Sequence, residues 1–209
     1  MQSFAALMMR SLVYLLFMAG VANIFAMEGY ALLAESKYDE GSATELMHDT
    51  FAFVTCMLFL IGAYYSDTLR PAAVVVATLS GMMLIREFDA FLDENMFDGA
   101  WQTLVCILIA TSTLYLIRQH HPVKPSLIEF SKLSSAGIYL SGILVVLVFS
   151  RLFGRGSFWE AVMGDGYVRV VKNIVEEGTE LMGYTILVIA AVEFLWQIVS
   201  QRRASNASR

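Results

Sequence analysis

The feature that most constrains this chain is a series of six long, predominantly apolar runs. A helix needs about 20 apolar residues to cross the roughly 30 Å hydrocarbon core of a bilayer. Each run is close to that length or longer, and the runs are 4–27, 45–65, 71–93, 100–118, 133–153 and 172–199. The chain is 57% hydrophobic and 16% charged, against about 45–50% and about 25% in soluble domains. The sequence therefore predicts an all-α polytopic membrane protein, a bundle of six transmembrane helices.

No Pro-rich or strongly charged linker divides the chain, so we expect a single domain over 1–200 and a short basic cytoplasmic tail over 201–209. Glycines punctuate 154–171 around Phe158–Met163, which predicts a short interfacial helix between the fifth and sixth spans. The first run also has features of a cleaved signal peptide, with Arg10 as its basic flank. That alternative stays open, although the run is long for such a segment.

Charge separates between the loops in a way that predicts topology. Segments 28–44 and 86–98 are acidic, whereas Arg70, segment 118–132 and the tail are basic. Because basic loops stay in the cytoplasm, we expect both termini inside and the acidic face outside. The expected location is the cell membrane as a multi-pass protein, and specifically a bacterial inner membrane. The prolines within 119–132 predict an irregular loop there, with His120 and His121 solvated.

Composition also limits the partners. The net charge of −5 argues against binding to nucleic acid. The two cysteines, Cys56 and Cys106, lie in apolar runs without CxxC spacing, which argues against a disulfide framework. The sequence contains no phosphate-binding loop and no nucleophile elbow. The expected partners are the lipid bilayer and a small ion or lipid ligand.

A stripe of polar residues opens the last apolar run. At about 100° per residue, one arc of this helix carries the polar side chains of Asn173, Glu176, Glu177, Glu180 and Tyr184. Ionisable side chains near the membrane are costly unless a partner compensates them. The residues around Glu45–Asp49 and Arg86–Asp89 offer such partners.

The depth of these groups suggests that they meet. His48, Glu87 and Glu180 each lie about 16 or 17 residues, or roughly 25 Å, from the other end of their runs. Glu45 and His48 are three residues apart, so both side chains share one helical face, as metal sites in helix bundles require. We therefore predict that His48, Glu87, Glu177 and Glu180 converge in one outward-facing cavity.

The resulting ligand inventory is rich in carboxylates. The predicted metal ligands are Glu45, His48, Asp49, Glu87, Glu177 and Glu180, and the predicted supporting residues are Arg86, Asp89, Glu176, Asn173 and Tyr184. A set dominated by carboxylates, with one imidazole, suits manganese, magnesium or calcium better than zinc. The expected cofactor is a divalent metal cation whose identity the sequence leaves open.

Four functions fit these residues. The favoured one is a one-sided divalent-cation site at the outer mouth of the bundle, because the runs below it carry few polar residues. A metal-dependent membrane hydrolase, acting on a lipid or amphiphile, would use His48 or Glu180 as its general base. The chain could instead be a cation transporter. It could also be a non-catalytic structural subunit in which Arg86, Arg169 and Lys172 neutralise the acids.

Two further patterns predict packing. Glu193 lies on the opposite face of the last run from the carboxylate stripe, and Arg10 is its expected partner. The small residues Gly137 and Ser141, four positions apart, predict a close approach of two helices.

Overall fold

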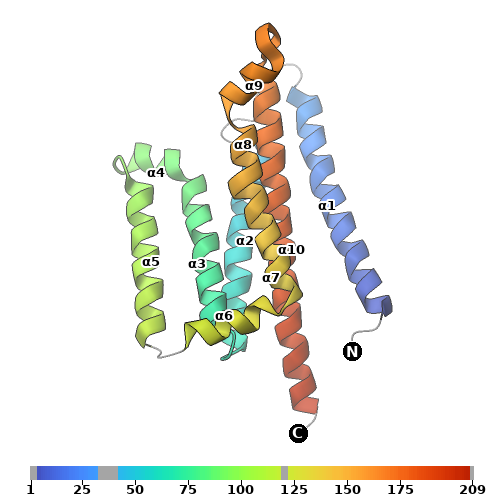
Figure 1. The fold of residues 1–209 in the computed structure, drawn as a ribbon, viewed down its shortest axis with the longest axis vertical. Coiled ribbons are helices and arrows are strands. Elements are labelled where there is room, and N and C mark those ends of the chain that lie inside the picture. The colour runs from blue at the N-terminus through green and yellow to red at the C-terminus, as the bar shows by residue number, and fades with distance from the viewer. Residues whose placement is uncertain (1–3, 33–41, 119–121, 208–209) are drawn as a thin grey trace. The chain divides into compact units, whose positions relative to one another are not determined.

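The chain folds as helices throughout the part that the structure, a computed structural model, describes (residues 4–32, 42–118 and 122–207) (Figure 1). Within these ranges no strand occurs, and five helical segments are long and apolar enough to cross a membrane. They are α1 Phe4–Leu32, α2 Ala43–Tyr65, α5 Ala100–Arg118, the run Ser134–Phe153, and α10 Arg169–Ala207. A bent helix pair is the sixth candidate, so the predicted all-α polytopic bundle is confirmed.

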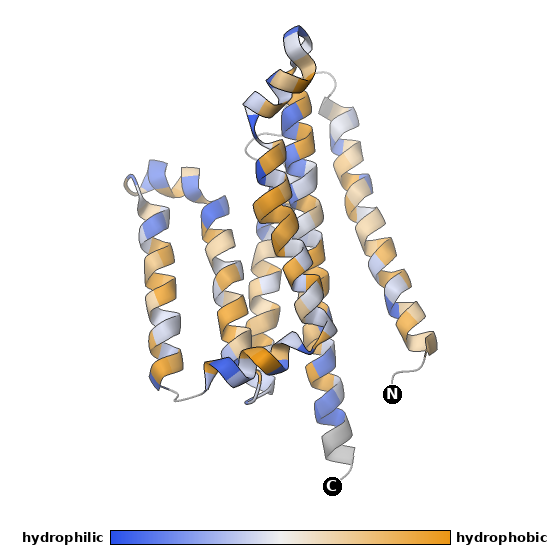
Figure 2. Cartoon of the chain, in the orientation of Figure 1, coloured by the Kyte–Doolittle hydropathy of each residue, from blue (hydrophilic) through white to orange (hydrophobic). Residues whose placement is uncertain are grey.

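The sixth candidate corrects the prediction of a straight helix over 71–93. It consists of α3 Arg70–Glu87 and α4 Asp89–Asn95, which meet at Phe88 with a bend of 60°. Arg86 and Asp89 therefore belong to different helices, on either side of this break. Figure 2 shows hydrophilic residues concentrated in α4, whereas hydrophobic residues cover most of α1 and α5.

Asp93 explains why the chain turns after α4. One of its carboxylate oxygens accepts hydrogen bonds from the backbone N–H groups of Gly99 and Ala100, each at 3.1 Å. These N–H groups lie at the start of α5, where backbone donors lack partners within the helix, and the Ala100 N–H also bonds the Phe97 carbonyl. Gly99 has a φ of +88°, a conformation that favours glycine. Asp93 thus has a structural role at the α4–α5 turn.

The predicted irregular loop 119–132 is largely a helix, α6 Val123–Ser131. Pro122 precedes this helix and Pro125 is its third residue. A proline is tolerated in the first helical turn, because backbone N–H groups there have no partner within the helix. The expectation that proline excludes a helix was therefore wrong. His120 and His121 lie outside the described residues.

The helix expected between the fifth and sixth spans is confirmed as α9 Gly156–Met163, followed by a 3-10 turn, η2 Gly164–Gly166. The indole N–H of Trp159 donates to the carbonyl of Phe153 at 2.5 Å, which ties α9 back to the preceding helix. At the other end of the last span, α10 continues to Ala207. Most of the expected tail, 201–209, is therefore helical.

The fifth span contains a feature that the sequence did not predict. It begins as α7 Ser134–Leu144, widens into a π-helix, η1 Val145–Ser150, and ends as α8 Arg151–Phe153. Wider π turns within helices are rare and often occur at functional sites. Here the π-helix ends at Ser150, next to Arg151, and both side chains contact a buried glutamate described below.

The described helices group into two compact units, 1–48 with 141–189, and 49–140 with 190–209. The second unit has an aromatic core of Phe59, Phe130, Tyr139 and Phe194, with ring centroids 4.8–6.2 Å apart in the contacting pairs. The prediction of a single domain over 1–200 stays a prediction.

The first unit holds a close approach between two helices. A Cβ atom added to Gly142 would lie 3.1 Å from the carbonyl oxygen of Gly183, and one added to Gly183 would lie 2.4 Å from the Val146 side chain. A Cβ added to Gly137 would meet no atom within 4 Å. The predicted close approach at Gly137 was therefore wrong, and the close approach occurs five residues later, at Gly142.

Candidate metal centre

The first turn of α2 is fixed at both its backbone and its side chains. The Ser42 hydroxyl accepts a hydrogen bond from the Glu45 N–H at 3.0 Å. Thr44 donates to one carboxylate oxygen of Glu28, through its N–H at 2.9 Å and its hydroxyl at 2.6 Å. Glu28 was expected in a loop, but it lies in α1. These bonds satisfy the exposed N–H groups of the helix start and orient His48, one turn further on.

His48 is almost completely buried, with 1% of its surface exposed. Its Nδ1 atom lies 3.7 Å from a carboxylate oxygen of Glu177, and its ring centroid lies 5.4 Å from that of Tyr184. Because the two ring nitrogens lie on different edges of the imidazole, Nδ1 facing Glu177 makes Nε2 the nitrogen suited to another ligand. Burial and ring packing hold the imidazole in this orientation.

Glu180 is 5% exposed, and two residues of the fifth span bind its side chain. One of its carboxylate oxygens accepts hydrogen bonds from the Ser150 hydroxyl at 3.0 Å and from the Arg151 guanidinium at 3.1 Å. The ligand atoms of His48 and Glu180 lie within 4.8 Å of each other. Sequence reasoning named Arg86, Arg169 and Lys172 as the neutralising cations, and it missed both Ser150 and Arg151. Their position at the C-terminal end of the fifth apolar run was the signal that could have identified them.

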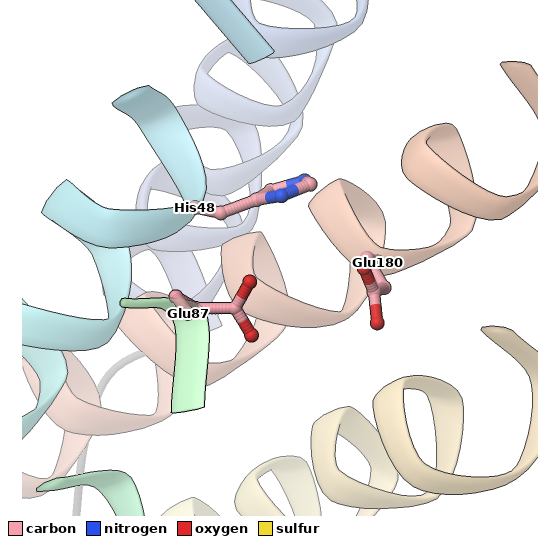
Figure 3. A group of neighbouring side chains, drawn as sticks. All are labelled: His48, Glu87 and Glu180. Atoms are coloured by element: carbon pink, nitrogen blue, oxygen red, sulfur yellow. The ribbon is translucent and has the colours of Figure 1, made fainter. Parts of the chain in front are cut away.

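Three residues form a group that could hold a metal ion: His48 of α2, Glu87 of α3 and Glu180 of α10 (Figure 3). Each offers one ligand atom. The side chain of Glu87 is 11% exposed, and one of its oxygens accepts a hydrogen bond from Arg86 at 3.0 Å. All three belong to the set of ligands predicted from the sequence.

Other predicted residues have different surroundings. Glu176 pairs with Lys172 at 2.8 Å, and its carboxylate lies against Gly154, where an added Cβ would be 2.1 Å from Oε1. Lys172 is thus one of the expected neutralising cations, whereas Arg169 is exposed. Asp89 accepts a hydrogen bond from the N–H of Ala90 at 2.7 Å.

The remaining predicted residues are the half-buried Glu45, Asp49 and Asn173. None of these three belongs to the group in Figure 3. Comparisons of the chain with protein-family models, curated proteins and solved structures found no match. The chemistry of the site is therefore argued from its own residues: a buried imidazole and carboxylates, which are ligands of divalent cations.

Proposed function

We propose that this chain is an integral membrane protein with a one-sided divalent-cation site, in which His48, Glu87 and Glu180 are ligands. The observation that carries the proposal is the group of three ligand atoms from these residues. The predicted topology puts the site at the outer mouth of the bundle. Glu177 lies beside His48, Ser150 and Arg151 donate to Glu180, and Arg86 donates to Glu87, so each of the three ligands has a partner that helps to orient it.

The contact between Glu177 and His48 supports the role of the imidazole. Histidines that bind metal commonly direct their second ring nitrogen to a carboxylate, which fixes the ring and increases its basicity. The 3.7 Å separation of Nδ1 and Glu177 is longer than a hydrogen bond but has this arrangement. The Nε2 atom would then bind the cation. In this proposal Glu177 therefore positions His48, whereas the sequence predicted it to be a metal ligand.

The one-sided character rests on the residues of α10 beyond Glu180. From Leu181 to Ile189 the polar side chains are Tyr184 and Thr185. The Thr185 hydroxyl donates to the Leu181 carbonyl at 2.7 Å, and Tyr184 packs on His48. A conduction path needs a continuing series of polar groups or a broken helix near the membrane centre. This stretch of α10 is continuous and supplies neither.

The ligand chemistry favours manganese as the first ion to test. Two carboxylates with one imidazole are intermediate between the all-oxygen sites that Mg²⁺ and Ca²⁺ prefer and the nitrogen- and sulfur-rich sites of Zn²⁺. Mn²⁺ accepts both kinds of ligand. Hydrolysis and transport stay predictions, because neither is needed to explain the contacts of the described residues.

A second candidate is a purely structural salt-bridge network, and the Arg151–Glu180 pair at 3.1 Å favours it. In the first unit Lys172 pairs with Glu176, and a protonated His48 would neutralise the charge of Glu177 beside it. The two candidates therefore differ in the protonation of His48. A metal ligand is a neutral imidazole, whereas the network is strongest with a protonated one.

The test is metal-dependent stability of the full chain, purified in detergent without chelator. Elemental analysis measures bound metal, and thermal unfolding is followed with Mn²⁺, Mg²⁺, Ca²⁺, Zn²⁺ or chelator. A cation at about 100 times its Kd should stabilise the fold by about 2.7 kcal/mol. His48→Gln and Glu180→Gln should abolish this stabilisation. Glu176→Gln, on the same helix but paired with Lys172, is the control and should retain it.

The pH dependence separates the two candidates. Protons compete with a cation for the imidazole, so metal-dependent stabilisation should weaken as the pH falls. The salt-bridge network should instead strengthen as His48 becomes protonated, and it should not respond to metal. Wild-type protein whose stability does not change with any of the four ions would rule out the metal site in favour of the network.

A further inference from the structure

A second candidate binding site lies within the second unit, among residues that the metal proposal does not use. A cavity of about 380 Å³ opens between the end of α2, the start of α3 and the last turns of α5. Its lining includes the cation Arg70, the aromatic side chains of Tyr64 and Tyr115, and the aliphatic side chains of Leu60 and Val74. It therefore combines one positive charge with aromatic and aliphatic walls.

Arg70 is held in place but retains unused donors. Its Nε–H donates to the carbonyl of Ala63 at 3.1 Å, and its Nη2 pairs with Asp67, whose side chain is 82% exposed. A guanidinium has five N–H donors. Three of them have no acceptor among the described residues of the protein. Because the Arg70 side chain is only 23% exposed, these donors border the cavity with limited access to water.

The chemical character of the lining changes with depth along the helices. Arg70 is the first residue of α3, Tyr64 is the next-to-last residue of α2, and Tyr115 is three residues from the end of α5. Leu60 and Val74 are each four residues further into their helices, or about 6 Å deeper. Tyrosine is characteristic of the level of the lipid headgroups. The cavity is therefore polar and cationic at the helix ends and aliphatic toward the helix centres.

We propose that this cavity binds one anionic phospholipid from the surrounding bilayer, with its phosphate on Arg70 and an acyl chain against Leu60 and Val74. Charge complementarity selects the headgroup, because a guanidinium forms its strongest hydrogen bonds with phosphate or carboxylate. The location selects a lipid, because α2 and α5 are membrane-span candidates and α3 forms part of another. Basic pockets between spans on the cytoplasmic side suit anionic headgroups. The proposal does not depend on the metal site.

The test measures binding of phosphatidylglycerol and phosphatidylcholine to the full chain in detergent, by native mass spectrometry. Phosphatidylglycerol should bind more tightly. Arg70→Gln should weaken it about tenfold, the factor expected for losing a charge-assisted hydrogen bond. Arg70→Lys keeps the charge and should restore part of the affinity. Lys124→Gln removes an exposed positive charge outside the cavity lining and should have little effect.

A blocking substitution tests the cavity independently of Arg70, whose bond to Ala63 also joins α2 to α3. Thr111 lines the cavity, and among the described residues its hydroxyl bonds the carbonyls of Ile107 and Leu108 in its own helix, at 2.8 and 3.0 Å. Thr111→Phe should fill the cavity and reduce phosphatidylglycerol binding. Thr103→Phe is the matched control, since the Thr103 hydroxyl also bonds its own helix at 3.2 Å but lies outside the lining.

Three results would overturn the proposal. They are equal binding of the two phospholipids, equal losses in Lys124→Gln and Arg70→Gln, and unchanged binding in Thr111→Phe. Free oleate that binds with the same Arg70 dependence, while phosphatidylglycerol does not bind, would overturn the choice of a phospholipid. Displacement of phosphatidylglycerol by millimolar inorganic phosphate would show that the acyl chain contributes little, and would overturn that choice too.

Discussion

The two halves of α10 carry one buried glutamate each, and these glutamates have different partners. Glu180 and Glu193 are both 5% exposed. In the first unit Glu180 accepts hydrogen bonds from Ser150 and from the cation Arg151. In the second unit Glu193 accepts a hydrogen bond from the neutral amide of Gln197 at 3.1 Å. The two equally buried carboxylates thus differ in these hydrogen bonds, and substituting each in turn tests whether they also differ in cation binding.

The packing around the two halves differs in the same way. Gly183, in the first half, allows close contact with the π-helical segment and brings polar side chains against α10. Phe194, in the second half, lies between aromatic rings, 4.8 Å from Phe59 and 5.6 Å from Phe130. The first half is built for polar contacts, and the second is built for a dense aromatic core. Four predictions test this contrast, beginning with the largest expected effect.

Phe194→Ala should destabilise the protein more than any other change proposed here. The ring is fully buried, and it fits so closely against Gly62 that an added Cβ there would lie 2.5 Å from it. Deleting a buried phenyl ring costs about 3–5 kcal/mol in soluble proteins. We expect about 3 kcal/mol, because lipid reduces the transfer part of that cost. Thermal unfolding in detergent measures the change, and a loss below about 1 kcal/mol would argue against a dense aromatic core.

Glu180→Gln and Glu193→Gln should separate the two glutamates most clearly. Both substitutions keep the size of a side chain that is 5% exposed. If only the first half binds a cation, Glu180→Gln removes the metal-dependent stabilisation, about 2.7 kcal/mol at 100 times the Kd, and Glu193→Gln retains it. Unfolding curves with and without Mn²⁺ measure the difference. Equal metal responses in the two variants would contradict the distinction between them.

Arg151→Gln should destabilise the protein by about 2 kcal/mol, the size of a hydrogen bond between charged groups. The full cost of breaking a buried ion pair, about 3–5 kcal/mol, is not expected, because the Arg151 side chain is 39% exposed. The double variant with Glu180→Gln should be less destabilised than the sum of the two single changes. Additive losses in this double-mutant cycle would show that the two side chains do not interact energetically.

The apolar periodicity of the sequence was sufficient to predict the helical class. Spans of about 20 apolar residues leave a backbone no other way to pair its polar groups in lipid. The break at Phe88 was not predictable in this way, because neither proline nor glycine marks it. Helix α6 was not predicted because its two prolines were taken to exclude a helix. Pro122 lies just before the helix and Pro125 lies in its first turn, where proline is tolerated.

The candidate site was predictable where it depends on spacing within one helix. His48, Glu87 and Glu180 were identified from their depth, which follows from a constant rise per residue. Ser150 and Arg151 were missed because a π turn changes the angle between successive side chains, and nothing in Val145–Ser150 marks such a turn. The aromatic core was equally hidden, since Phe59 and Phe194 occur in predominantly apolar runs where nothing distinguishes these two rings from the other apolar side chains.

Ser150→Ala should have the smallest effect, about 1 kcal/mol, and it tests whether the π-helix serves Glu180. The Ser150 hydroxyl lies 2.7 Å from the Val146 carbonyl and 3.0 Å from the Glu180 carboxylate. Since a hydroxyl has one proton, the two acceptors compete for it. Removing the hydroxyl therefore removes one donor from Glu180 while Arg151 remains. A typical hydrogen bond contributes about 1 kcal/mol to stability, and competition from the Val146 carbonyl keeps the expected loss at this level.

The effect of Ser150→Ala on stability should be measured both in the wild type and in Glu180→Gln, because the comparison identifies the acceptor of the Ser150 hydroxyl. If the hydroxyl donates to Glu180, Ser150→Ala should destabilise the wild type more than it destabilises Glu180→Gln, where the acceptor is uncharged. If it donates to Val146, the loss should be the same in both backgrounds. Ser80→Ala is a suitable control, because the Ser80 hydroxyl also contacts a carbonyl one turn back, Val76 at 3.1 Å, but lies in the second unit. The stability loss caused by Ser80→Ala should be the same in the wild type and in Glu180→Gln. If it changed with Glu180→Gln as much as the loss caused by Ser150→Ala does, the π-helix would have no special role.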